Sequence, residues 1–256
     1  MTTYSQPRPH SRVVVTGASS GIGAATVRLL RANGWDTVAV ARREDRLAAL
    51  SKETGCSYRV CDVTDAEAMR ALAAELNEEA PVTAVVVNAG GAHGSDPVAE
   101  GSVEDWTWMY EVNVAGALNT TQAFLPGLRE HGGDLLYLTS TAAHETYPGG
   151  AGYTAAKHAE SMIPQTMRLE LVGEPVRIFE VCPGMVKTEE FSLNRLGSAD
   201  AAAKVYEGVT NPLVADDIAD IIAYCLSRPT HVVLDRIDTR PVAQANTMVV
   251  ARHKGV

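Results

Sequence analysis

The sequence lacks the positive charge and the long apolar runs that two large classes of protein require. Its 256 residues contain 22 Lys and Arg against 31 Asp and Glu, which gives a formal net charge of −9. A protein that binds nucleic-acid backbones carries a basic patch or stripe, so this balance argues against such a role. No run of about 18 apolar residues occurs, and we therefore expect no helix to span a membrane.

Cysteine is also scarce. The four cysteines, Cys56, Cys61, Cys182 and Cys225, show no CxxC pair and no Cys/His spacing typical of zinc sites, so we predict no metal site. Scattered cysteines favour a reduced, cytoplasmic protein. The first ten residues, MTTYSQPRPH, lack the apolar segment of a secretory signal, and we expect residues 1–10 to form a mobile tail.

With 46% hydrophobic and 21% charged residues, the composition is that of an ordinary globular protein. Neither an internal repeat nor a Pro/Ser-rich linker divides the chain, so we expect residues 11–256 to form a single domain. Short β-branched runs alternate with longer helical patterns, which is typical of α/β proteins in which helices cover both faces of a doubly wound parallel sheet. The strand candidates are residues 12–16, 36–41, 57–61, 83–88, 134–139 and 176–182.

Capping signals mark several helix ends. Thr64 and Glu67 predict a capping box, and Ser102 is a predicted N-cap. Gly34 and Gly55 predict helix stops. Beyond the sixth strand, the pattern predicts a substrate-covering segment at about 189–212, a helix near 216–226 and a last strand at 231–234.

A glycine-rich turn follows the first strand. The run TGASSGIG places Gly17, Gly21 and Gly23 before a helical pattern. Glycine permits a tight turn there, and the N-terminus of a helix attracts a pyrophosphate. The spacing G-x-x-x-G-x-G differs from the G-x-G-x-x-G fingerprint, so a purely structural turn is the alternative.

The end of the second strand discriminates between the two nicotinamide dinucleotides. An acid there would bind the ribose 2′-hydroxyl of NAD, whereas this chain has Ala41 followed by Arg42 and Arg43. Guanidinium groups suit the 2′-phosphate of NADP. The alternative is a solvated helix start in which Glu44 and Asp45 neutralise the arginines, yet a helix start prefers acids to bases. We therefore predict NADP(H) as the cofactor.

A tyrosine, a lysine and a serine form the candidate catalytic group. Tyr153 and Lys157 are four residues apart, so on a helix their side chains project from one face. An ammonium nearby lowers the pKa of a tyrosine, which would make Tyr153 an acid/base catalyst. Ser140 follows a strand and lies at the ligand-binding edge of a doubly wound sheet. Taken singly these residues are uninformative, because such pairs are usually exposed neighbours and such serines usually form turns.

The combination resembles the short-chain dehydrogenase/reductase family. The chain has TGASSGIG at 16–23, VNAG at 87–90, NVAG at 113–116, Ser140, YTAAK at 153–157 and PGMVKT at 183–188, in that family's order. The resemblance covers about residues 12–190. It implies a Rossmann-type fold, an oxidoreductase that interconverts a hydroxyl and a carbonyl, and a homo-oligomer, either a tetramer or a dimer.

The resemblance also implies a role for each matching residue. Tyr153 is the expected general acid/base, Lys157 lowers its pKa and holds the nicotinamide ribose, and Ser140 orients the carbonyl. Asn113 is expected to complete a proton relay. The remaining cofactor contacts are expected from Gly17, Ser19, Ser20, Gly21, Ile22, Gly23, Arg42, Arg43, Asp62, Val63, Asn88, Ala89, Gly90, Pro183, Gly184, Val186 and Thr188. The alternatives are an N-cap neighbour for Asp62 and an ordinary turn for Pro183–Gly184.

The C-terminal third is similar to NADP-dependent dehydrogenases of short 3-hydroxy acids. Arg195 is the candidate partner of a substrate carboxylate, and a surface cation beside Glu189 and Glu190 is the alternative. His144 and Tyr147 are expected to flank the pocket. The leading hypothesis is an NADP(H)-dependent oxidoreductase of a short 3-hydroxy acid or a related small alcohol.

Two other functions stay open. A reductase of larger ketones would use the same catalytic residues, whereas a nucleotide-sensing regulator would need none of them. The complete set of Asn113, Ser140, Tyr153 and Lys157 therefore opposes the regulator.

Pro164 lies inside the helix that carries Tyr153 and Lys157. A proline there should bend the helix and could alter a subunit contact.

Overall fold

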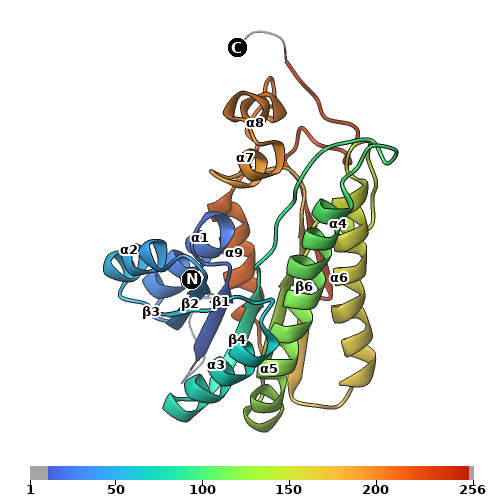
Figure 1. The fold of residues 1–256 in the computed structure, drawn as a ribbon. Helices are drawn as coiled ribbons and strands as arrows, with labels where there is room; N and C mark the ends of the chain where they lie inside the picture. Colours follow the sequence, from blue (N-terminus) through green and yellow to red (C-terminus); the bar gives the residue numbers. More distant parts are fainter. Residues whose placement is uncertain (1–10, 254–256) are drawn as a thin grey trace.

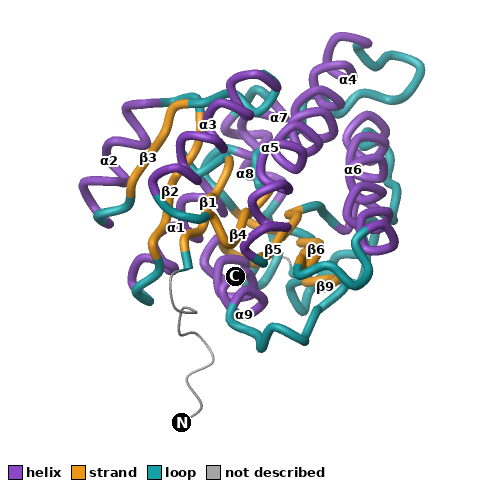
Figure 2. The backbone as a smooth tube through the Cα atoms, turned by 90° about the horizontal axis from the view of Figure 1, so that it is seen from below, coloured by secondary structure: helices purple, strands orange, loops and turns teal. Residues whose placement is uncertain are grey.

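The computed structural model describes residues 11–253, so the tail predicted at residues 1–10 lies outside the described residues. Seven parallel strands form one sheet in the order β3-β2-β1-β4-β5-β6-β9 (Figure 1; β5 and β9 are labelled in Figure 2). They are β1 Arg12–Thr16, β2 Asp36–Ala41, β3 Ser57–Val60, β4 Val82–Val87, β5 Gly133–Leu138, β6 Val176–Pro183 and β9 Arg236–Thr239. The order changes direction between β1 and β4, which is the point at which doubly wound folds bind their ligands.

Helices cover both faces of this sheet, as Figure 2 shows from below. One layer comprises α1 Gly21–Ala32, α2 Glu44–Thr54 and α9 Ala215–Leu226. The other comprises α3 Ala66–Glu79, α5 Gly116–His131 and α6 Ala151–Glu170, and α4 Val103–Tyr110 leads into α5 and packs beside α6. The predicted doubly wound α/β fold is confirmed.

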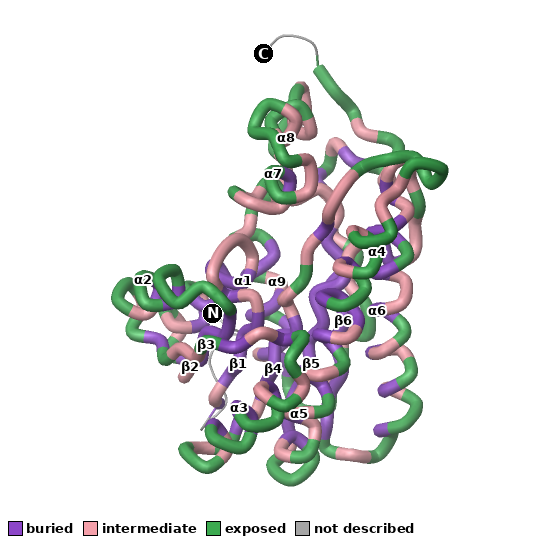
Figure 3. The backbone as a smooth tube through the Cα atoms, in the orientation of Figure 1, coloured by how far each residue is buried: buried purple, intermediate pink, exposed green. Residues whose placement is uncertain are grey.

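The side chains of each strand alternate between the two layers, because successive residues of a strand point to opposite faces. Val13 and Val15 of β1 belong to the apolar cluster that contains α1 and α9, whereas Val14 belongs to the cluster that contains α3 and α5. Figure 3 shows the buried strands between helices that are partly exposed. Burial on both faces explains why the strands consist of continuous β-branched runs.

The helix ends agree with the capping signals at three of four places, including Gly34, which directly follows the C-cap of α1 with a φ of +83°. Ser102 caps α4, and Gly55 ends α2 with a φ of +72°, both as predicted. The capping box predicted at Thr64 is wrong, because Asp65 is the N-cap of α3 and accepts hydrogen bonds from two backbone N–H groups of its first turn. The Thr64 hydroxyl instead donates to Asp62 at 2.9 Å.

All six predicted strands form, with ends within one residue of the predicted bounds. The last strand is misplaced, because residues 231–234 are turn and loop and the edge strand is β9. A turn closed by a hydrogen bond from Val232 N to Pro229 O at 2.8 Å occupies the start of this segment instead. The chain can pair with β6 only after the turn has ended.

Helix α6 continues through Pro164, which is buried within it. Proline lacks the N–H that would bond one turn back, but this loss falls seven residues beyond Lys157. The turn that carries Tyr153 and Lys157 therefore stays helical.

The segment from β7 to β8, residues 186–214, lies over the carboxyl ends of the strands (Figure 1). Two short parallel strands, β7 Val186–Lys187 and β8 Leu213–Val214, pair with each other. Between them the chain forms α7 Phe191–Leu196 and α8 Ala199–Val205, within the segment predicted to cover the substrate. Among the described residues, no helix combines the length and the apolar character needed to cross a bilayer.

Candidate active site

A cavity of about 700 Å³ runs along the carboxyl ends of the strands. Its volume falls in the range typical of small-molecule sites. All of the predicted cofactor residues line it, together with Ser140, Tyr147 and Arg195. Asn113 and His144 are not among the lining residues. The structure thus brings together nearly the whole set that the sequence singles out.

The glycine turn between β1 and α1 is packed too tightly for side chains. Gly17 and Gly21 adopt φ values of +66° and +52°, which favour glycine. A Cβ on Gly23 would lie 2.5 Å from the Gly17 carbonyl oxygen. Helix α1 begins directly after this turn, with no acidic residue in its first turn and no side-chain cap from Ser20. The open N–H groups and the helix dipole form a cradle for a phosphate group.

The turn after β4 is fixed against the glycine turn. The amide of Asn88 donates to the Thr16 carbonyl oxygen at 2.8 Å, and the Thr16 hydroxyl accepts from the backbone N–H groups of Asn88 and Ala89 at 3.0 and 3.1 Å. A Cβ on Gly17 would lie 2.7 Å from the Asn88 amide nitrogen. Asn88 therefore fixes the relative position of the two loops that are predicted to bind the cofactor, through its side-chain amide and its backbone N–H.

The basic pair after β2 stands at the rim of the cavity. Arg42 is largely exposed and lies 3.7 Å from the Asp62 carboxylate. Arg43 donates to the hydroxyls of Ser19 and Ser20 and forms two hydrogen bonds of 2.8 Å with Glu190. The partners of both arginines are thus distant in sequence, rather than the Glu44 and Asp45 of the alternative interpretation.

Asp62 lies between the basic pair and α3. Its Oδ1 accepts hydrogen bonds from the backbone N–H and the hydroxyl of Thr64 at 3.0 and 2.9 Å. Asp62 and Val63 line the cavity. Val63 also packs closely on Gly116, because a Cβ added to that glycine would lie 2.7 Å from a methyl group of Val63. Asp62 is therefore both a neighbour of the α3 cap and a wall of the cavity.

Tyr153 and Lys157 lie on one face of α6 and both are buried. The Lys157 Nζ lies 6.0 Å from the centre of the Tyr153 ring and donates to the Leu138 carbonyl oxygen at 3.2 Å. Burial raises the pKa of Tyr153, although the Lys157 ammonium and the Ser140 hydroxyl lower it. The effect of Lys157 has the predicted sign, but desolvation is the larger effect, so the pKa of Tyr153 is raised overall.

Ser140 follows β5 at the end of the sheet and starts a short helical turn, Thr141–Ala143. Its Oγ accepts from the Ala142 N–H at 3.1 Å and donates to the Pro183 carbonyl oxygen at 3.3 Å. Pro183, Gly184, Val186 and Thr188 line the same part of the cavity. These contacts hold the hydroxyl against the turn after β6.

Asn113 lies in a π-helical turn, Glu111–Ala115, that joins α4 to α5. Such turns are rare and often occur at functional sites. The buried amide donates to the carbonyl oxygens of Gly91 and Met109 at 2.9 and 2.7 Å. A Cβ on Gly90 would lie 2.5 Å from Asn113 Oδ1 and 3.5 Å from Lys157 Nζ, so both polar groups border the same glycine.

Arg195 reaches the cavity from the end of α7. It donates to the carbonyl oxygens of Gly94 and Gly149 at 3.1 and 3.0 Å and to the Tyr147 hydroxyl at 2.8 Å. Its guanidinium lies 5.8 Å from the centre of the Tyr153 ring. Within residues 11–253 no carboxylate forms an ion pair with it, so the structure contradicts the alternative of a surface pair with Glu189 or Glu190.

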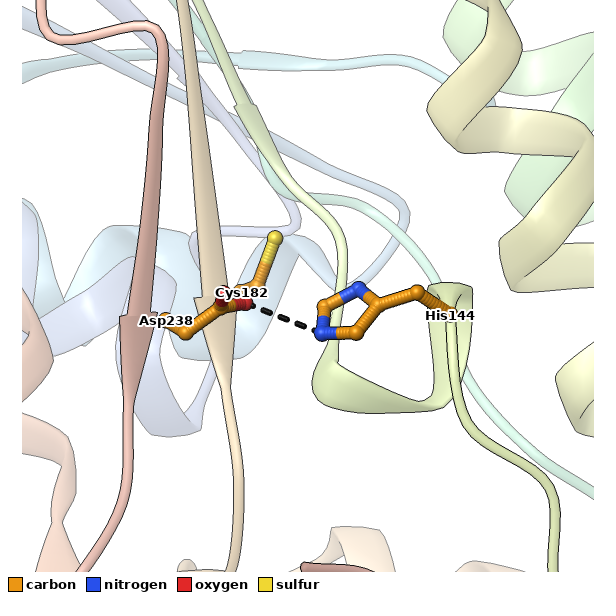
Figure 4. A group of neighbouring side chains, drawn as sticks. All are labelled: His144, Cys182 and Asp238. Atoms are coloured by element: carbon orange, nitrogen blue, oxygen red, sulfur yellow. Dashed lines mark ion pairs between the residues drawn. The ribbon is translucent and has the colours of Figure 1, made fainter.

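His144 points away from the cavity, and the expectation that it flanks the pocket is wrong. Figure 4 shows its ring directed toward Cys182 of β6 and Asp238 of β9. The Nε2 of His144 lies 3.1 Å from an Asp238 carboxylate oxygen, while the Cys182 thiol forms a 3.1 Å hydrogen bond with Thr139. The three potential metal-ligand atoms lie within 4.8 Å of one another. This group could not be predicted from the sequence, because its members are far apart along the chain.

Two residues that belong to no motif also matter here: Gln244 lines the cavity, and Glu160 is buried beside Lys157. Gln244 accepts from the Met185 N–H at 2.8 Å and so supports the turn after β6 from the C-terminal part of the chain. Glu160 forms an ion pair of 2.6 Å with Lys157 inside the protein. A carboxylate three residues after the lysine was visible in the sequence, but its burial was not.

Comparisons with known proteins agree with this geometry. A family model described as short chain dehydrogenase matches residues 11–196. An uncharacterized oxidoreductase of Mycobacterium tuberculosis is 51% identical over 94% of both chains. Serine 3-dehydrogenase of Rhizobium radiobacter is 36% identical, with 91% of this chain and 94% of that protein covered. A closed form of serine dehydrogenase complexed with NADP+ superimposes with a TM-score of 0.89 at 32% identity and covers 95% of this chain and 100% of that one. The predicted family is confirmed, and the chain belongs to the short-chain dehydrogenase/reductase family of oxidoreductases.

Proposed function

We propose that this oxidoreductase uses NADP(H) to interconvert the hydroxyl group of a short 3-hydroxy acid, or a related small alcohol, with a carbonyl. The observation that carries the substrate class is Arg195. It is a cation in the cavity wall beside Tyr153, and within the described chain it has no carboxylate partner. A small acid whose carboxylate met Arg195 would have its reacting carbon near the phenol.

The cavity fits the cofactor in three respects. The glycine turn has no room for a Cβ at Gly23, and the N-terminus of α1 is open to a phosphate. At the end of β2, Ala41 stands where the acid of an NAD site would be, and Arg42 and Arg43 follow it at the cavity. The related serine dehydrogenase is named as a complex with NADP+. When bound, the cofactor would carry the hydride.

The residues of this chain would then handle the proton. In reduction, the Tyr153 phenol would give its proton to the carbonyl oxygen, and in oxidation the phenolate would take it back. Ser140 would orient that oxygen through its hydroxyl. Lys157 would stabilise the phenolate by its charge and hold the nicotinamide ribose, while Asn113 would support a proton relay through water beside Gly90.

The substrate class can be tested with Arg195→Gln. Each hydrogen bond between charged partners contributes about 1.5–3 kcal/mol, so KM for short 3-hydroxy acids should rise roughly 10- to 100-fold. The assay follows NADPH formation from 3-hydroxy acids and from neutral secondary alcohols of matched length. KM for the neutral alcohols should change less than about twofold, because they offer Arg195 no charge. An equal loss for both substrates would show that Arg195 only supports the loops at Gly94 and Gly149.

The same screen, extended to bulky ketones, separates the alternative functions. Faster turnover of bulky ketones than of small acids would favour a reductase of larger substrates. Absence of turnover with tight NADPH binding would favour a nucleotide-sensing regulator. We expect the short 3-hydroxy acids to be turned over fastest.

We further propose that the described residues form one domain, since all seven strands share one sheet. A homo-oligomer, dimer or tetramer, is supported by the apolar side chains that α5 and α6 expose, among them Leu118, Met162 and Leu169. A cytoplasmic location is supported by the four scattered cysteines, which are buried as free thiols.

A further inference from the structure

A carboxylate is buried beside the catalytic lysine, on the same helix. Glu160 lies three residues after Lys157 on α6, and its side chain is 1% exposed. The Lys157 Nζ lies 2.6 Å from Glu160 Oε2, and the lysine side chain is itself only 5% exposed. The proton-transfer chemistry proposed above does not use Glu160. A buried carboxylate without a structural or chemical purpose would be costly.

A second carboxylate lies behind the pair. Glu180 of β6 is fully buried, and its Oε1 accepts hydrogen bonds from Ser161 at 2.5 Å and from Thr139 at 3.0 Å. Among residues 11–253, Oε2 of Glu180 has no hydrogen-bond partner, and Oε2 of Glu160 meets Lys157 as an ion pair rather than in an aligned hydrogen bond. One cation and two acids therefore share the space between α6 and β6.

The electrostatics of this group link the charge of Lys157 to Glu160. Burial lowers the pKa of Lys157, because it favours the neutral amine, but the charge of Glu160 and of Tyr153 outweighs burial and the pKa is raised overall. Burial raises the pKa of Glu160 to about 7, with Glu180 adding to the rise and Lys157 opposing it. Buried lysines without such a partner can have a pKa of about 5–6.

The other titratable groups around the pair do not replace Glu160. Cys182 of β6 and Tyr137 of β5 are both buried, and desolvation raises the pKa of each, so both are neutral near pH 7. Burial also raises the pKa of Tyr153, which favours its neutral phenol. Within the described chain, Glu160 is the carboxylate that forms an ion pair with Lys157.

We propose that Glu160 is a positioning residue that keeps the buried Lys157 protonated and holds its Nζ between the Glu160 carboxylate and the Leu138 carbonyl oxygen. The consequence for catalysis rests on the proposed function, because Lys157 can assist Tyr153 only while it carries its charge. Without Glu160, the amine would lose its proton within the working pH range, and the phenolate would lose the cation that stabilises it.

The ion pair can be tested without any turnover. The chain has five lysines, so the ¹³Cε signals of a lysine-labelled, cofactor-free protein can be followed by NMR, with Lys157→Arg to assign the signal. In the wild-type protein the Lys157 signal should keep its ammonium position beyond the ordinary lysine pKa of about 10.4. In Glu160→Gln its midpoint should fall by more than two pH units. Identical midpoints in both proteins would overturn the proposal.

The catalytic consequence is tested by the pH profile of kcat for carbonyl reduction at saturating NADPH. Glu160→Gln should move the alkaline limb to lower pH, with a fall of about tenfold per pH unit beyond the new midpoint. Glu160→Asp keeps the charge at a greater distance and should give an intermediate NMR midpoint and profile. Glu170→Gln removes an exposed charge from the same helix and should match the wild type.

Each outcome decides one question. A uniform loss of activity with an unshifted profile would show that Glu160 has only a structural role, and would overturn the proposal. If Glu160→Gln does not fold, the Lys157 NMR midpoint of Glu160→Asp is compared with that of the wild type instead. An unshifted midpoint in Glu160→Asp would then overturn the proposal. A shifted NMR midpoint in a protein that turns over no substrate would support the ion pair and refute the proposed function instead.

Discussion

The selectivity for NADPH over NADH should depend on Arg42, and the replacement Arg42→Ala tests this. The side chain is 61% exposed, and its Asp62 partner is 3.7 Å away and 39% exposed. Because this contact is long and solvated, removing Arg42 should disturb the fold very little. Arg43, by contrast, is already engaged by Ser19, Ser20 and Glu190, so its replacement would mix several effects.

The expected magnitude follows from the exposure. A hydrogen bond between charged partners contributes about 1.5–3 kcal/mol, and an exposed arginine belongs at the lower end. A loss of about 1.4 kcal/mol corresponds to a tenfold rise in Kd. We therefore expect the Kd for NADPH to rise about tenfold and that for NADH less than about twofold, with the NADPH effect shrinking as salt is added.

The assay is a titration of the cofactor-free protein, followed by the fluorescence of the reduced nicotinamide. Arg28→Ala is the control, because Arg28 is also an exposed arginine, pairs with Glu53 and is not among the residues that line the cavity. If Arg42→Ala weakened NADPH and NADH by the same factor, the assignment of the basic pair to the 2′-phosphate would be refuted.

Two further substitutions test the site and the fold. Tyr153→Phe removes only the phenol oxygen, so kcat should fall at least about 100-fold while the Kd for NADPH changes little, and substantial remaining turnover would contradict the acid/base role. Arg177→Met removes a guanidinium that forms two 2.7 Å hydrogen bonds with the buried Asp134 and others with the carbonyl oxygens of Arg228, Pro229 and Val232. Its removal leaves a buried charge poorly compensated, so the free energy of unfolding in urea should fall by about 3–5 kcal/mol, and a loss under about 1 kcal/mol would contradict this reasoning.

The sequence predicted what depends on local pattern. Strand positions came from β-branched runs, and the residues around the cofactor came from motifs whose order follows the carboxyl edge of the sheet. Thr64 was mistaken for a cap because Asp65, the next residue, offers the same chemistry. The last strand was misplaced because only pairing with β6, a tertiary contact, decides which four residues join the sheet.

Burial and direction of side chains were not accessible from the sequence. His144 lies close in the chain to residues of the cavity, yet its ring turns toward Asp238. From the sequence alone, Glu160 would be taken for an ordinary exposed glutamate of a helix. Only the packing of α6 on β6 shows that it is buried. The net pKa of Tyr153 likewise depends on desolvation, which a spacing of four residues does not encode.

The packing of the glycine turn sets limits on redesign of this enzyme. A Cβ on Gly17 or Gly23 would lie less than 3 Å from a neighbouring backbone atom. Directed evolution should therefore tolerate almost no substitution at these two positions of the phosphate cradle. The rim at Arg42 is solvated and held by one long contact. Substitutions that change the cofactor preference should therefore be made at the end of β2, because a new side chain there would extend into solvent rather than clash with the backbone.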